Sequence, residues 1–293
     1  SRTALWQSEG FISKQRHHTV IVRSISAIVA ILMLVGTYYF FREAGLIAIS
    51  SLISLVGIFE YSRLSFKPLQ APKYIQAAFF ILSAIIYFVV LDQALFSHLL
   101  IALCSCVFLS IPLLRVSKKE DLNIALQVQM AGLMGFVYVA LFPALAVKTL
   151  QFENGLNWFL CLLSIVFAGD TFAYVFGRAF GKDKLLEAVS PKKTLQGSAG
   201  GLLGSVCAGL FFHYFWIGEI PVYYMIALSL ITGVFAQIGD LFESLLKRIA
   251  DVKDSGSIMP GHGGLLDRLD GVFFAAPVYY IVVFFIVQMR ILG

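Results

Sequence analysis

The stretch from Ser244 to Asp270, SLLKRIADVKDSGSIMPGHGGLLDRLD, concentrates ionisable side chains between two apolar segments. It holds four acids, four Lys or Arg residues, one His and a Gly-rich turn. Glycine lets backbone N–H groups approach phosphate oxygens closely, and ammonium or guanidinium groups neutralise those oxygens. Carboxylates that gather in one place repel each other unless a cation joins them. The stretch therefore predicts a site that binds phosphate groups and a metal ion.

Further acids lie inside segments that are otherwise apolar. Asp170 lies deep in one such segment, and Asp240 and Glu243 lie near the end of another. Ionisable groups at that depth are costly, and they are functional by default. Asp240, Glu243, Ser244 and Lys247 share one helix face by their spacing. Oxygen ligands without cysteine favour Mg²⁺ or Mn²⁺ over softer metals.

A structural alternative is that these acids only form ion pairs, for instance Asp240 with Lys247 two helical turns later. The number of acids near one rim argues against it, since five are expected there: Asp170, Asp240, Glu243, Asp267 and Asp270. Asp267 and Asp270 would share a helix face if the last helix begins early.

A second cationic loop, GKDKLLEAVSPKKTLQGSAGG at residues 181–201, has the same character. Lys192 and Lys193 stand between a Ser-Pro pair and a Gly-rich turn, which predicts phosphate binding. Lys182 and Lys184 fit phosphate binding and a solvated anchor beside the membrane equally well.

The elements that must position these residues are membrane helices. Apolar residues make up 59% of the chain and charged residues 13%, and the mean hydropathy is +0.86. A soluble domain carries about a quarter charged residues, so an all-α integral membrane protein is predicted. About 20 apolar residues cross the hydrocarbon core. Nine segments qualify, at about 24–41, 43–60, 74–91, 95–114, 128–147, 157–179, 200–217, 222–246 and 271–290.

Nine membrane crossings would place the two ends of the chain on opposite sides of the membrane, so the distribution of Lys and Arg residues tests this topology. Of the 22 Lys and Arg residues, 19 fall on the side of the N-terminus and three on the other. Positive charge marks the cytoplasmic side, so the N-terminus and both charged loops are expected in the cytoplasm. The net charge of +5 reflects this topology, and no nucleic-acid partner is implied.

The expected organisation has three parts. Residues 1–23 form a cytoplasmic N-terminal segment, and residues 24–147 form about five membrane helices. Residues 148–293 form a catalytic membrane region of about four helices, with cytoplasmic loops at 180–199 and 247–270.

Two classes of function fit a polytopic protein with these features. One is an enzyme that joins a phosphate-bearing lipid to a nucleotide, and the other is an ion-coupled transporter. Transporters tend to show inverted repeats with a site at the midplane. Here the acids gather toward one face and no repeat is visible, which favours the enzyme.

The charged stretch resembles the signature of the CDP-diacylglycerol synthases, or phosphatidate cytidylyltransferases. The resemblance covers about residues 160–275, and its segments are SLLKRIADVKDSG at 244–256, PGHGGLLDRLD at 260–270, GDLFES at 239–244, SPKKT at 190–194 and Asp170-x-x-x-Tyr174-x-x-Gly177. Leu195 and Gln196 depart modestly, since a bulky aromatic or aliphatic residue and Glu are expected at these positions.

The resemblance implies the reaction CTP + phosphatidate → CDP-diacylglycerol + pyrophosphate at the cytoplasmic (inner) membrane, with a related CTP-dependent lipid kinase as the nearest competitor. It implies Asp240, Asp267, Asp270 and Lys247 as catalytic residues. The three aspartates would hold Mg²⁺, with Asp170 and Glu243 as further ligands or supporting contacts. A second, monovalent cation such as K⁺ and a homodimer are also implied. The implied substrate-binding residues are Ser190, Lys192, Lys193, Thr194, Ser244, Arg248, Lys253, His262, Gly263, Gly264 and Arg268.

Overall fold

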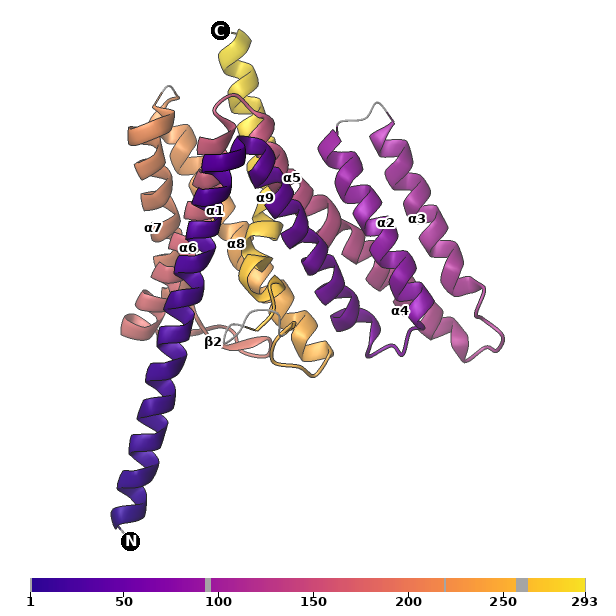
Figure 1. Ribbon diagram of the computed structural model, residues 1–293, viewed down its shortest axis with the longest axis horizontal. Helices are drawn as coiled ribbons and strands as arrows, with labels where there is room; N and C mark the ends of the chain where they lie inside the picture. The colour runs from indigo at the N-terminus through magenta and orange to yellow at the C-terminus, as the bar shows by residue number, and fades with distance from the viewer. Residues whose placement is uncertain (1, 93–95, 219, 257–262, 293) are drawn as a thin grey trace.

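The computed structural model describes residues 2–292 except 93–95, 219 and 257–262, and leaves out the side chains of 2–32, 34 and 289–292. The chain forms a bundle of helices with one small β-hairpin (Figure 1). The elements are α1 Arg2–Phe66, α2 Lys73–Asp92, α3 Ser97–Leu113, α4 Asp121–Gly135, η1 Phe136–Leu141, α5 Phe142–Lys148, η2 Thr149–Gln151, α6 Gly155–Phe180, β1 Lys184–Leu186, β2 Ser190–Thr194, α7 Leu195–Phe212, η3 His213–Ile217, α8 Val222–Ile249 and α9 Leu266–Leu292.

The prediction of an all-α polytopic membrane protein is confirmed. Within the described residues, seven helical runs are long and apolar enough to cross a membrane, where nine were expected. The 17 residues of α3 give about 25 Å of helix, which is short for a hydrocarbon core of about 30 Å. The first two predicted segments form the single element α1. Its chain reverses at Arg42, with φ 54° and ψ −143°, so that no connecting loop separates them (Figure 1).

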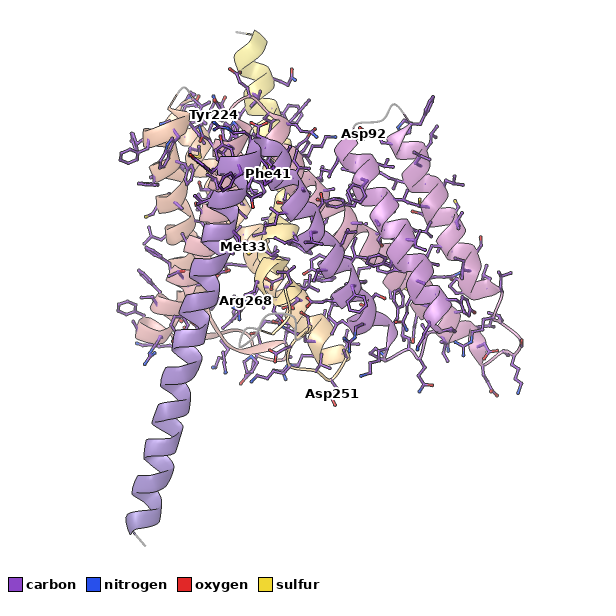
Figure 2. All side chains as sticks on the ribbon, viewed as in Figure 1. Met33, Phe41, Asp92, Tyr224, Asp251 and Arg268 are labelled. Carbon is purple, nitrogen blue, oxygen red and sulfur yellow. The ribbon has the colours of Figure 1, made fainter. Side chains whose placement is uncertain are left out.

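The charged loops meet at one end of the bundle. Figure 1 shows the N-terminus and the β-hairpin at this end and the C-terminus at the other. Asp251 and Arg268 lie near the hairpin end in Figure 2, whereas Asp92 and Tyr224 lie at the opposite end. This arrangement agrees with an odd number of passes. It also agrees with the separation of charge that the sequence predicts.

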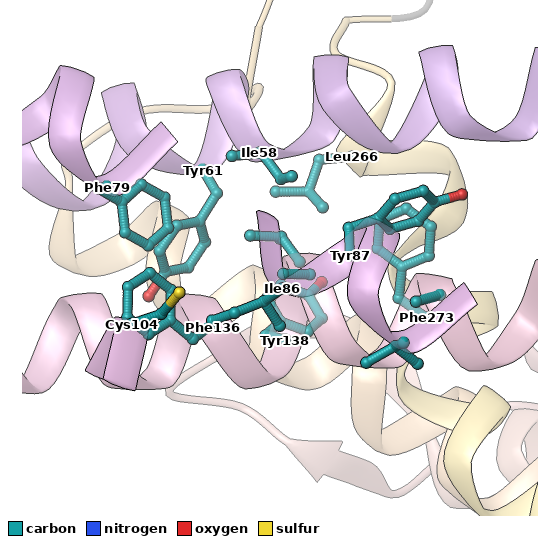
Figure 3. Packing of buried hydrophobic residues seen from close by; sticks show 14 of the residues in the cluster. Ile58, Tyr61, Phe79, Ile86, Tyr87, Cys104, Phe136, Tyr138, Leu266 and Phe273 are labelled. Atoms are coloured by element: carbon teal, nitrogen blue, oxygen red, sulfur yellow. The ribbon is translucent and has the colours of Figure 1, made fainter. Parts of the chain in front are cut away.

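Aromatic packing joins the two halves of the chain. Phe79 of α2 stacks on Phe136 of η1, with ring centroids 5.5 Å apart, and it also packs against Tyr61 of α1. Leu266 and Phe273 of α9 belong to the same buried cluster (Figure 3). The start of α9 is therefore held by helices from the N-terminal half as well as by its sequence neighbours.

Small residues, among them Gly200 and Gly204 of α7, allow α6 and α7 to pack closely. A Cβ atom on Gly200 would lie 2.4 Å from the Phe176 side chain, and one on Gly204 would lie 2.6 Å from Phe172. Neither position has room for a larger residue. This contact brings the hairpin that precedes α7 next to Asp170 on α6.

Candidate active site

Ionisable side chains from four elements, α6, β2, α8 and α9, line a cavity of about 480 Å³ at the hairpin end of the bundle. Its described lining includes five acids and five bases, whose formal charges cancel. The acids are Asp170 on α6, Asp240 and Glu243 on α8, and Asp267 and Asp270 on α9; the bases are Arg178, Lys192, Lys193, Lys247 and Arg268. The acids that the sequence predicts to cluster therefore do so. The lysine pair of the second loop joins them.

The lysine pair lies in the second strand of the hairpin, which runs directly into α7. β1 and β2 are antiparallel, with Lys184 opposite Thr194 and Leu186 opposite Ser190. The Thr194 side chain accepts a hydrogen bond from the Gly197 N–H at 3.1 Å, which caps α7. The strand is thus fixed at the point where it lines the cavity.

Gln196 fixes the other side of the hairpin. Its Oε1 atom accepts from the backbone N–H groups of Lys182 (3.0 Å) and Asp183 (3.2 Å), and its Nε2 atom donates to Asp183 Oδ2 at 2.7 Å. A glutamate could not donate this last bond. Lys184 Nζ donates to the Pro191 carbonyl at 2.5 Å, so this lysine supports the hairpin from within.

Two lysines lie between the carboxylates. Lys193 Nζ is 2.5 Å from Asp240 Oδ2, and Lys247 Nζ is 2.6 Å from Glu243 Oε2 and 2.7 Å from Asp267 Oδ1. The acids therefore do form ion pairs, as the structural alternative proposed, but Asp240 pairs with Lys193. Lys247 pairs with Glu243 and Asp267. Two turns of helix separate Asp240 from Lys247 by about 10 Å, whereas the observed pairs use adjacent turns or neighbouring elements.

Asp267 is the most extensively bonded acid of the site. Helix α9 begins at Leu266, ahead of the predicted segment 271–290, so the condition for Asp267 and Asp270 to lie on one helix is met. The Oδ2 atom of Asp267 accepts from the N–H (2.9 Å) and the hydroxyl (2.9 Å) of Ser255 and from the N–H of Gly264 (2.8 Å). Gly263 has φ +82°, a conformation that suits glycine. Asp267 therefore closes the loop of the charged stretch.

The remaining acids differ in their exposure to solvent. Asp170 is exposed where it lines the cavity, and Asp240 is partly exposed. Asp270 is 7% exposed and accepts a bond from the Gly271 N–H at 2.8 Å. Glu243 is 1% exposed, and its Oε1 atom has no hydrogen-bond partner among the described residues.

The carboxylate oxygens of these acids are the type of ligand that a hard cation such as Mg²⁺ prefers. One of them, Glu243 Oε1, is buried without a hydrogen-bond partner among the described residues. Across the part of the chain that the structure describes, no group of three or more His, Cys, Asp or Glu side chains forms a ready-made metal site. Instead, the ammonium groups of Lys193 and Lys247 pair with Asp240, Glu243 and Asp267.

A second cavity of about 650 Å³ adjoins the first. Lys192 and Lys247 line both. Arg248 also lines it, and its Nε atom donates to the Val189 carbonyl at 3.3 Å. The predicted substrate residues divide accordingly: Lys192, Lys193, Thr194 and Arg268 line the first cavity, and Ser190, Lys192, Ser244, Arg248 and Lys253 line the second. Gly263 and Gly264 lie against Asp267, and His262 lies outside the described residues.

The sequence analysis missed several residues of the site. Gln237 and Ser198 line the first cavity and bond to each other, including Gln237 Nε2 to the Ser198 carbonyl at 3.0 Å. Gln237 lies three residues before Asp240, so the helix-face spacing could have found it. Arg178 lies one residue after Gly177 of the recognised segment.

The fold and the cavity together define a polytopic membrane protein with a mixed-charge site at one end of its helices. The family model described as the cytidylyltransferase family matches residues 21–286. The chain belongs to the cytidylyltransferase family, which confirms the family assignment made from the motifs.

Three similar curated proteins carry the name phosphatidate cytidylyltransferase. That of Staphylococcus haemolyticus is 42% identical over 125 residues, covering 43% of this chain and 48% of the relative. That of Bacillus subtilis is 41% identical over 128 residues (44% and 48%), and that of Staphylococcus aureus is 45% identical over 125 residues (43% and 48%). The chain spans about half the length of the curated relatives it matches.

Proposed function

We propose that this protein is a phosphatidate cytidylyltransferase, which converts CTP and phosphatidate into CDP-diacylglycerol and pyrophosphate. The observation that carries the proposal is the cavity in which five acids and five bases meet at one end of the membrane helices. The names of the relatives support the same reaction. A nucleotide needs access from water and a phospholipid needs access from the bilayer, and a cavity at the end of a helical bundle borders both.

The bases bind and neutralise phosphate groups. A phosphate oxygen of phosphatidate attacks the α-phosphorus of CTP, and the bond to the bridging oxygen of the β-phosphate breaks. Pyrophosphate leaves with the electron pair of that bond. The attacking oxygen is ionised at neutral pH, so no general base is needed. The residues position the groups and stabilise the charge that spreads onto the leaving pyrophosphate. Lys192 and Lys247 serve this role best because they line both cavities.

Of the three aspartates that the resemblance implies as ligands, Asp240 and Asp270 would hold Mg²⁺ together with Asp170. Both oxygens of the third, Asp267, already accept bonds from Lys247, Ser255 and Gly264, so it would orient the site. When bound, the ion supplies charge stabilisation for the triphosphate as a Lewis acid. The formal neutrality of the cavity supports an accompanying cation, because a polyphosphate alone would leave uncompensated negative charge. Binding of Mn²⁺ to the purified protein, followed by electron paramagnetic resonance, tests this without turnover. Asp240→Asn should weaken binding, and Asp92→Asn at the other end of the bundle should not.

We propose further that the site faces the cytoplasm, as the charge bias indicates. Glu187→Cys on the hairpin and Glu153→Cys at the opposite end, each in a Cys-free background, make a matched pair. In intact cells, an impermeant thiol reagent should label Glu153→Cys alone. Labelling of Glu187→Cys from outside would refute the orientation.

One assay separates the function classes. The full chain in vesicles receives labelled CTP and phosphatidate, with and without Mg²⁺. Labelled lipid together with pyrophosphate supports the proposal. Release of CDP with a phosphorylated lipid would instead identify a lipid kinase. Ion flux without turnover would identify a transporter.

A further inference from the structure

Glu60 is a buried carboxylate that lines neither cavity and lies far from the site in sequence. It is 2% exposed on α1, and Tyr61 beside it is fully buried in the aromatic core of the N-terminal half. A carboxylate in such surroundings is costly unless its oxygens are used.

One oxygen of Glu60 binds the start of α9. Its Oε2 atom accepts from the Leu266 N–H at 2.8 Å. Leu266 is the first residue of the helix, and its N–H has no partner within the helix. A negative charge is also favourable at a helix N-terminus. The next residue along the helix is Asp267.

The same carboxylate touches both ends of the loop that Asp267 closes. Ser255 Oγ lies 3.5 Å from Glu60 Oε2 and donates to Asp267 Oδ2 at 2.9 Å. A Cβ atom on Gly256 would lie 2.3 Å from Glu60 Oε1, and one on Gly264 would lie 2.8 Å from Oε2. The two carboxylates thus share Ser255, and the loop ends fit around them because residues 256 and 264 lack side chains.

We infer that Glu60 is a positioning residue of the proposed transferase, which fixes the start of α9 and both ends of the loop. It acts through Asp267 and Asp270 and touches no substrate. The inference rests on the proposed function for its kinetic consequences, whereas its structural consequence at Leu266 holds whatever the protein does.

The kinetic test uses the full chain in vesicles with labelled CTP, phosphatidate and Mg²⁺. Glu60→Ala should lower kcat by about 10- to 100-fold, the usual effect of losing a supporting contact to a site. The KM for CTP should change little, because Glu60 lines neither cavity. Glu60→Gln should restore most of kcat, since an amide oxygen can accept the Leu266 N–H. Glu43→Ala, at an exposed position on the same α1, is the matched control.

Gly256→Ala tests the contact from the other side. Its added methyl group should lower kcat in the wild-type background and have no further effect in Glu60→Ala, where the colliding carboxylate is gone. Equal effects in the two backgrounds would overturn the inference. So would a Glu60→Ala variant within about twofold of wild type, or a Glu60→Gln variant as impaired as Glu60→Ala. If Glu60→Ala does not accumulate, unchanged turnover of Gly256→Ala overturns it.

Hydrogen exchange separates this inference from the proposed function. Glu60→Ala should speed deuterium uptake in the peptide that contains Leu266, and Glu43→Ala should not. If wild type makes no CDP-diacylglycerol but the uptake changes as expected, the proposed function fails and the positioning role stands. Unchanged uptake in Glu60→Ala overturns the positioning role alone.

Discussion

Asp240→Asn and Asp267→Asn should both abolish turnover but should differ sharply in stability. Asp267 is 8% exposed by its side chain, pairs with Lys247 and accepts three further hydrogen bonds from Ser255 and Gly264. An asparagine has one acceptor oxygen. Its NH₂ group must therefore face either the Lys247 ammonium or the backbone N–H donors.

The expected cost follows from these contacts. Breaking a buried charge pair by changing one partner costs about 3–5 kcal/mol. At about 2–4 °C per kcal/mol for a chain of this size, the melting temperature of Asp267→Asn should fall by roughly 6–20 °C. Asp240 and Lys193 are 38% and 24% exposed by their side chains, so solvent screens their pair. Loss of the Asp240–Lys193 pair should lower the free energy of unfolding by about 0–1 kcal/mol.

The measurement is thermal unfolding of the purified variants in one detergent, with turnover measured on the same samples. Asp92→Asn, exposed at the opposite end of the bundle, is the control for both readouts. Equal melting temperatures for Asp240→Asn and Asp267→Asn would refute the separation of roles. So would an Asp267→Asn variant that melts with the wild type.

The lysine pair of the hairpin and the glycines of α7 give two more tests. Replacing Lys192 and Lys193 with Gln should lower kcat/KM for CTP or phosphatidate by at least about 10- to 100-fold, since each charged hydrogen bond contributes about 1.5–3 kcal/mol. The same change at the exposed Lys118 and Lys119 should have little effect, and equal losses would favour a membrane-anchor role for the hairpin lysines. Gly204→Ala should destabilise the protein by about 1–3 kcal/mol, because the added Cβ would lie 2.6 Å from Phe172. A melting temperature for Gly204→Ala equal to wild type would contradict the tight α6–α7 contact.

Much of the candidate site follows from local sequence patterns. The acids of α8 share a face with Lys247 by helical spacing alone, and Asp170 is conspicuous because it interrupts an apolar segment. Glu60 interrupts another apolar segment, so the same rule could have identified it. The reversal at Arg42 was also predicted, since the first two expected segments end at 41 and begin at 43, whereas the predicted span 95–114 forms only the short α3.

The membrane class, the all-α architecture and the end of the bundle at which charge gathers could all be predicted from the residues alone. These depend on composition, on the length of apolar runs and on spacing within one helix. Three contacts emerge only from the packing of the folded chain: Lys193 with Asp240, Lys247 with Asp267, and Glu60 with the start of α9. The pairs that link different elements join residues from 20 to 206 positions apart, as Lys247 with Asp267 and Glu60 with Leu266 show. Helical periodicity defines which side chains share a face, but only close packing between helices determines which faces meet.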